Sequence, residues 1–111
     1  MKEKKVAKRY AKALFDLAVE QNVLEKIKAD AQLINSVCVS NRDFMMVLRS
    51  PIIKDVKKMK IMKDIFGNHV QKMTLSFMNI ITRNRRERIL PEIANQFIEI
   101  YKEHNLSLIH I

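Results

Sequence analysis

The side chains that carry most enzyme chemistry are few and scattered in this sequence. His69, His104 and His110 lie far apart and Cys38 is the only cysteine, so no spacing typical of a metal site is present. Gly67 is the only glycine, which excludes a glycine-rich phosphate-binding loop. No serine lies in a glycine-flanked nucleophile turn. We therefore expect a chain that is not an enzyme and that uses no cofactor and no metal.

Positive charge is the more prominent chemical feature. The chain has 21 Lys and Arg against 12 Asp and Glu, a formal net charge of +9, which permits attraction to nucleic acid, an anionic membrane surface or an acidic protein. The run Arg83–Arg88 could hold phosphates. No aromatic side chains alternate with these arginines, as they do in base-stacking surfaces, so we favour a solvated turn at the carboxyl end of a helix. A small basic RNA-binding helical bundle remains the alternative function.

Length and composition predict one all-α domain. The chain has 111 residues, 48% of them hydrophobic, with one Gly and two Pro, and so few helix breakers favour helices joined by short connections. Apolar periodicity predicts six of them, over about 6–21, 23–39, 42–49, 55–66, 69–83 and 90–105. No apolar run reaches the roughly 20 residues of a membrane span, so we expect no direct insertion into a membrane.

Two of these helices carry more apolar surface than one core contact needs. Wound at about 100° per residue, segment 6–19 has an apolar arc of roughly 200° and segment 69–83 one of about 220°, against about 100° for an ordinary surface helix. Either both helices are fully buried, or each covers the core with one flank and offers the other to a partner. If the two helices pack side by side, their spare flanks form one groove.

Local signals predict where the helices begin and end. Asn22, with Glu25 three residues later, predicts an amino-terminal cap for the second helix. Ser40 or Asn41 is expected to cap the third, which should stop at Ser50 because a residue before proline leaves the helical region. The remaining expected signals are a left-handed Gly67 after the fourth helix, an Asn68 cap for the fifth and a helix end at Asn105.

Burial can also be predicted from the periodic pattern. Cys38, between two valines, is expected to be a small buried apolar residue. Ile52 and Ile53, in the turn after the third helix, are expected to fill the core. Asp30 and Lys58 are expected to face water.

The last six residues, 106–111, do not fit the helical pattern. They are apolar, follow an expected helix end, and match a translation of the transposase end used in sequencing adaptors. We expect the native domain to span 1–105, with the tail being non-native.

The sequence resembles the amino-terminal part of the ATP synthase delta (OSCP) subunit family from Val6 to about Asn105. The similar stretches are 6–15 (VAKRYAKALF), 48–52 (LRSPI), 77–81 (FMNII), 90–93 (LPEI) and the positions Asn84, Arg86 and Phe97. Together these pieces are moderately specific, although each alone is weak. The resemblance implies a six-helix bundle, no nucleic-acid partner and a peripheral place on the cytoplasmic face of the bacterial inner membrane.

In that family this domain holds the amino-terminal helix of an alpha subunit in a groove between the first and fifth helices, and so ties the catalytic head to the peripheral stalk. The small side chain of Ala13 would let the tail approach closely, and Asn84 would lie at the groove end. The family's carboxyl-terminal domain, which meets the b subunits, is missing here. By position, the resemblance assigns the groove to Tyr10, Ala13, Leu14, Leu17, Phe77, Ile80, Ile81 and Asn84.

Overall fold

The computed structural model describes residues 2–109, with side chains described over 2–106. The described chain forms α1 (Lys2–Glu20), α2 (Leu24–Ser40), α3 (Arg42–Arg49), α4 (Asp55–Phe66), α5 (Lys72–Arg83) and α6 (Leu90–Ile109), with a single 3-10 turn, η1 (Glu87–Ile89). The six-helix, all-α prediction is confirmed. No helix in the described part is long and apolar enough to cross a membrane.

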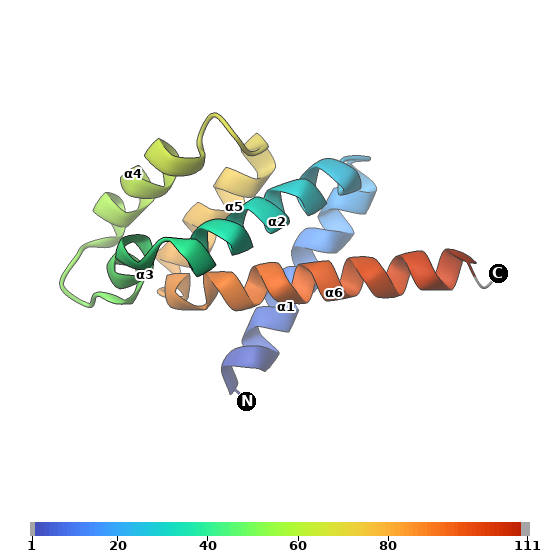
Figure 1. The fold of residues 1–111 in the computed structure, drawn as a ribbon, viewed down its shortest axis with the longest axis horizontal. Helices are drawn as coiled ribbons and strands as arrows, with labels where there is room; N and C mark the ends of the chain where they lie inside the picture. Colours follow the sequence, from blue (N-terminus) through green and yellow to red (C-terminus); the bar gives the residue numbers. More distant parts are fainter. Residues whose placement is uncertain (1, 110–111) are drawn as a thin grey trace.

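The last helix organises the bundle. α1 and α2 both pack along α6, whereas α5 packs mainly on α4. In Figure 1, α6 runs across the front, α1 crosses behind it, and α3 and α4 lie at the opposite end from the carboxyl terminus. α6 therefore separates the α1 layer from the α3–α4 end, and α5 lies deeper in the molecule behind α2.

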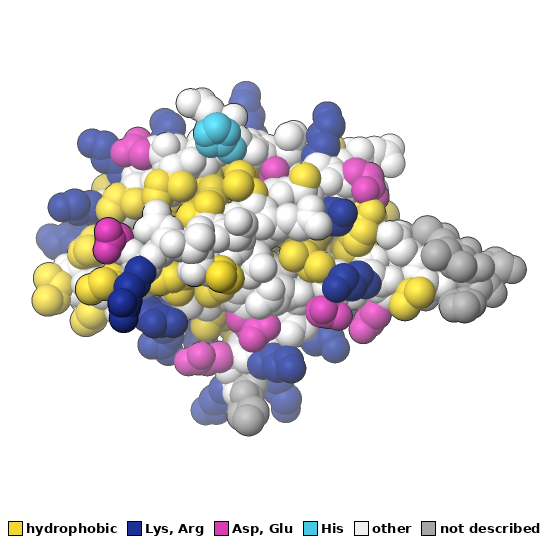
Figure 2. Space-filling view, viewed as in Figure 1, with side chains coloured by type: hydrophobic (Ala, Val, Ile, Leu, Met, Phe, Trp, Pro, Cys, Tyr) yellow, Lys and Arg dark blue, Asp and Glu magenta, His cyan; other side chains and the backbone are white. Residues whose placement is uncertain are grey.

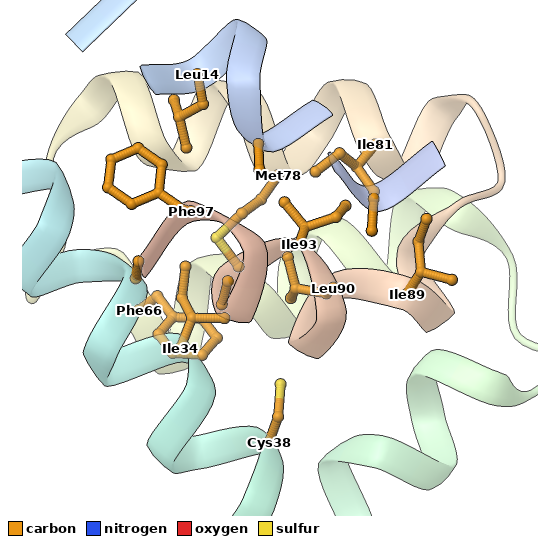
Figure 3. Packing of buried hydrophobic residues seen from close by; sticks show 14 of the residues in the cluster. Leu14, Ile34, Cys38, Phe66, Met78, Ile81, Ile89, Leu90, Ile93 and Phe97 are labelled. Atoms are coloured by element: carbon orange, nitrogen blue, oxygen red, sulfur yellow. The ribbon is translucent and has the colours of Figure 1, made fainter. Parts of the chain in front are cut away.

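Aromatic and branched side chains from every helix meet in one core. Phe97 of α6 is fully buried and its ring centroid lies 5.8 Å from that of Phe15 of α1. Phe44 of α3 and Phe66 of α4 meet edge to face, with centroids 5.6 Å apart. Figure 3 shows Met78 of α5 between the side chains of α1 and α6. These contacts bury apolar side chains from all six helices.

The prediction that Asn41 caps α3 is confirmed, whereas the prediction that Asn22 caps α2 is wrong. The Asn41 side chain accepts a hydrogen bond of 3.0 Å from the Phe44 amide, and Ser50 is extended before Pro51. Asn22 has φ 59° and ends α1 instead of starting α2. The Val23 amide donates to the Ala18 carbonyl and the Asn22 amide to Val19, which is the Schellman arrangement that a left-handed residue closes.

The expected helix signals around Gly67 are also wrong. Gly67 is right-handed, with φ −52°. A Cβ atom there would clash with the Lys63 carbonyl oxygen, so the close approach of the backbone and not handedness favours glycine. α5 begins at Lys72 after an extended Gln71, so Asn68 does not cap it. Asn105 does not end α6, which continues to Ile109.

Several burial expectations are corrected by the fold. Ile52 is 88% exposed and does not fill the core, because its loop protrudes beyond α3. Figure 2 shows hydrophobic side chains exposed at this end, with Lys and Arg around them. Ile53 is half-buried. Of the residues from 106 onward, only Leu106 has a described side chain, which is exposed; the expectation about the tail otherwise lies outside the described side chains.

Lys58 does not face water but forms a buried ion pair. Its Nζ atom lies 2.6 Å from Glu87 Oε2 and donates to the Leu48 carbonyl at 3.2 Å. Lys58 is 4% exposed and Glu87 is 8% exposed. The pair therefore joins α3, α4 and η1 at one point of the core.

Cys38 is buried, as predicted, at 6% exposure. Burial raises the pKa of its thiol to about 12, because the charged thiolate loses its water. A thiol with that pKa is protonated and unreactive at neutral pH.

Candidate partner-binding groove between α1 and α5

The wide apolar arc of α1 divides into a buried and an exposed flank. The buried flank fills the core with Ala7, Ala11, Leu14, Phe15 and Ala18. On the other flank Tyr10 is half-buried, Ala13 is exposed and Leu17 is 41% exposed. These three residues have the spacing i, i+3, i+7 and share one side of the helix. The core therefore uses only part of the apolar surface of α1.

α5 divides in the same way. Thr74, Met78, Ile81 and Thr82 are buried. Phe77 is half-buried, Ile80 is 48% exposed and Asn84 is exposed, again at the spacing i, i+3, i+7. α5 thus also keeps an apolar strip that the described chain covers only in part.

Tyr10 joins the two strips. Its ring meets the Phe77 ring edge to face, with centroids 6.1 Å apart and an interplanar angle of 76°. Its hydroxyl accepts a hydrogen bond of 2.9 Å from Asn84 Nδ2. Because α1 packs mainly on α6 and α5 on α4, α1 and α5 meet chiefly through side chains. The structure therefore brings Tyr10, Phe77 and Asn84 together across 74 residues of sequence.

Leu14 and Ile81 lie beneath this surface and not on its walls. Leu14 is 5% exposed and Ile81 is fully buried, and Figure 3 shows both in the core with Met78 and Phe97. The helical wheel could not separate them from their neighbours, because both lie at the border between the two flanks. They lie beneath the candidate surface, on which Tyr10, Ala13, Leu17, Phe77, Ile80 and Asn84 are half-buried or exposed.

The groove surface is suited to binding and not to proton transfer. None of its six residues is a Lys, Arg, His, Asp or Glu. A partner that buried the half-exposed side chains of Leu17 and Ile80 would gain favourable binding free energy. Tyr10 and Asn84 offer polar atoms at one end of this surface. An amphipathic helix that lays its apolar face into such a groove is a recurrent mode of recognition.

The basic run has a structural explanation. Arg85 has φ 60° and ends α5, with its amide donating to Thr82 and the Arg86 amide donating to Ile81. Glu87 is held by Lys58 in the core. Sequence reasoning missed this buried pair, because a glutamate among arginines shows no periodic signal of burial.

Comparison with known proteins finds one family over nearly the whole chain. The family model described as the ATP synthase delta (OSCP) subunit matches residues 6–109. ATP synthase subunit delta of Cytophaga hutchinsonii is 40% identical over 103 residues, covering 93% of this chain and 57% of the relative. That of Bacillus cereus strain B4264 is 37% identical over 98 residues, covering 88% and 54%.

A solved structure has a similar fold. A chain in the cryo-EM structure of the Toxoplasma gondii mitochondrial ATP synthase hexamer superposes with a TM-score of 0.76 at 24% identity, covering 82% of this chain and 51% of that one. This chain spans a little over half the length of the curated relatives it matches. With nearly all of its residues inside the family model, the chain belongs to the ATP synthase delta (OSCP) subunit family.

Proposed function

We propose that this chain is a non-catalytic stator component of an F-type ATP synthase, and that its α1–α5 groove binds the amino-terminal helix of an alpha subunit. The family membership supports the complex to which it belongs. The observation that carries the groove assignment is the exposed apolar strip on each helix, joined at Tyr10, Phe77 and Asn84. The role is mechanical, since the bound tail would keep the catalytic head from turning with the rotor.

The groove can supply affinity in the range such a link needs. Leu17 and Ile80 are 41% and 48% exposed, and completing the burial of two such side chains contributes on the order of 2 kcal/mol. Phe77, Ala13 and the tail's own apolar residues add to this. A micromolar complex requires about 8 kcal/mol in total, which a helix of a few turns in this groove can reach.

The rest of the proposed link lies outside this chain. We assign contact with the b subunits to the part of the family's length that this chain does not span. The complex would place the domain at the cytoplasmic face of a bacterial inner membrane, as a peripheral component. The domain alone would hold the head without completing the connection to the stalk.

The test is Ala13→Asp, with Ala29→Asp as its matched control. Both alanines are exposed within helices, but Ala29 lies on α2 away from the groove. Titration calorimetry with a peptide of the alpha-subunit amino terminus should show binding to the native chain. Ala13→Asp should weaken it at least about tenfold, because burying an unpaired charge costs more than 1.4 kcal/mol. Ala29→Asp should bind like the native chain.

Equal binding by both variants, with helical circular dichroism retained, would remove the groove assignment. Loss of helical signal in Ala13→Asp alone would instead mean that Ala13 is needed for folding. A parallel titration with single-stranded RNA at low and high salt tests the alternative. Salt-sensitive RNA binding without any peptide binding would favour the RNA-binding function.

A further inference from the structure

A buried carboxylate from α2 holds the start of α5. Asp30 is 5% exposed, and its Oδ2 atom accepts hydrogen bonds from the Gln71 amide at 2.8 Å and from the Thr74 hydroxyl at 2.6 Å. None of the ion pairs found among the described residues involves Asp30. Its negative charge is therefore met by the amino-terminal end of a helix that lies 41 residues later in the chain.

α5 has no cap of its own. Gln71 occupies the cap position but its side chain makes no capping bond, and the first turn contains no acidic residue. Lys72 in that turn is exposed and has the wrong sign for the positive end of a helix dipole. Asp30 consequently accepts from the amide of the cap residue, as the glutamate of a capping box does, and places a negative charge near this end of the helix.

Apolar packing between α2 and α5 is interrupted at this end of α5. A small cavity of about 20 Å³ is lined by Ile27 and Ala31 of α2 and by Thr74 and Phe77 of α5, together with residues of α1 and α6. A gap of this kind removes dispersion contacts across it. The two hydrogen bonds of Asp30 link α2 directly to the amino-terminal end of α5.

We propose that Asp30 is a positioning residue for the α1–α5 groove, which it does not touch. α5 is held near its carboxyl end by fully buried Ile81 and by the Asn84–Tyr10 hydrogen bond, and at its amino end by Asp30. Without the two hydrogen bonds of Asp30, the amino-terminal part of α5 could rotate about Ile81. Phe77 lies four residues from Ile81, which is about 6 Å at a rise of about 1.5 Å per residue, so a rotation of about 10° would move the Phe77 backbone by about 1 Å. This proposal rests on the proposed function for what occupies the groove.

The test compares Asp30→Ala and Asp30→Asn with Tyr101→Phe. Tyr101→Phe is the matched control. It removes the hydrogen bond from Tyr101 of α6 to Glu25 of α2, which joins α2 to α6 and not to α5. Two readouts are made on folded protein: the proton–proton contact between the Tyr10 and Phe77 rings by NMR, and affinity for the alpha-subunit tail peptide. Amide exchange over 72–77 reports on the first turns of α5.

Asp30→Ala should weaken or abolish the ring contact, speed exchange in the first turns of α5 and weaken peptide binding about tenfold, equivalent to about 1.4 kcal/mol. Asp30→Asn should retain the ring contact, because an amide oxygen can accept the same two hydrogen bonds. Exchange and peptide affinity should change less in it than in Asp30→Ala, because only the charge is lost. Tyr101→Phe should leave the ring contact and affinity at native values. If Asp30→Ala does not fold, Thr74→Val removes one of the two bonds and should give a smaller change in the same direction.

The proposal is overturned if folded Asp30→Ala, or Thr74→Val in its place, keeps the native ring contact. It is also overturned if Tyr101→Phe disturbs that contact as much. Failure of the native chain to bind the peptide would instead overturn the proposed function. The ring contact in the free protein would still decide whether Asp30 positions α5.

Discussion

Replacing Glu87 by methionine should be among the most damaging single changes in this protein. The substitution leaves the Lys58 ammonium in the core, 4% exposed, with only the Leu48 carbonyl, 3.2 Å away, as a partner. Removing one member of a buried ion pair costs about 3–5 kcal/mol. That is a large share of the roughly 5–15 kcal/mol by which a domain of this kind is stable.

The corresponding change in melting temperature follows from the chain length. Unfolding entropy of about 2.1 cal/mol/K per residue gives roughly 0.23 kcal/mol per kelvin for 111 residues. A loss of 3–5 kcal/mol then lowers the midpoint by about 13–21 °C. Urea and thermal unfolding followed by circular dichroism at 222 nm measure both quantities.

Two further variants make this reasoning refutable. Glu3→Gln breaks the exposed Glu3–Arg88 pair at 3.9 Å and should change stability by less than about 0.5 kcal/mol. The double variant Lys58→Met/Glu87→Met removes both buried charges and should recover to within about 1 kcal/mol of the native chain. A Glu87→Met loss below about 1 kcal/mol, or a double variant as unstable as the single one, would contradict the assignment.

Two other predictions concern a helix cap and the thiol. Asn41→Ala removes the hydrogen bond to the Phe44 amide and should lower the free energy of unfolding in urea by about 1 kcal/mol. Asn41→Asp keeps the acceptor and should be nearly as stable as the native chain. Equal losses of stability in the two variants would show that this hydrogen bond does not stabilise α3. The Cys38 thiol, with its pKa raised by burial from 9.0 to about 12, should react with iodoacetamide at pH 8 only after unfolding. Because the folded state holds this proton more tightly, its contribution to stability is intact below pH 9 and is lost between about pH 9 and 12. Rapid labelling of native protein, or the same loss of stability between about pH 9 and 12 in Cys38→Ala, would contradict this.

Helix number and most helix positions could be predicted because they depend on local order. Apolar periodicity places the core flank of each helix, and Asn41 and the Ser50-Pro51 step act on their immediate neighbours. The local signals that failed are those that tertiary contacts override. Asn22 could cap α2 or end α1, and a left-handed φ of 59° shows the second outcome.

The candidate groove was predicted partly from the residues and partly from resemblance. The excess width of two apolar arcs indicated unused surface on α1 and α5, and the resemblance placed Tyr10, Phe77 and Asn84 together. Leu14 and Ile81 could not be separated from the groove surface, because a helical wheel gives direction around one helix but not the distance to the next. The packing of the helices in the folded chain buries both, Leu14 at 5% exposure and Ile81 completely.

The sequence by itself determined the helices, their apolar flanks and the family, since these depend on spacing and residue type along one chain. Only the tertiary structure decided which charges are buried. Asp30 and Lys58 have polar neighbours in sequence, yet they lie in the core because Thr74 and Glu87, 44 and 29 residues away, offer them hydrogen bonds there. A buried charge is stable only where its partner lies, and that place is not known until the chain has folded.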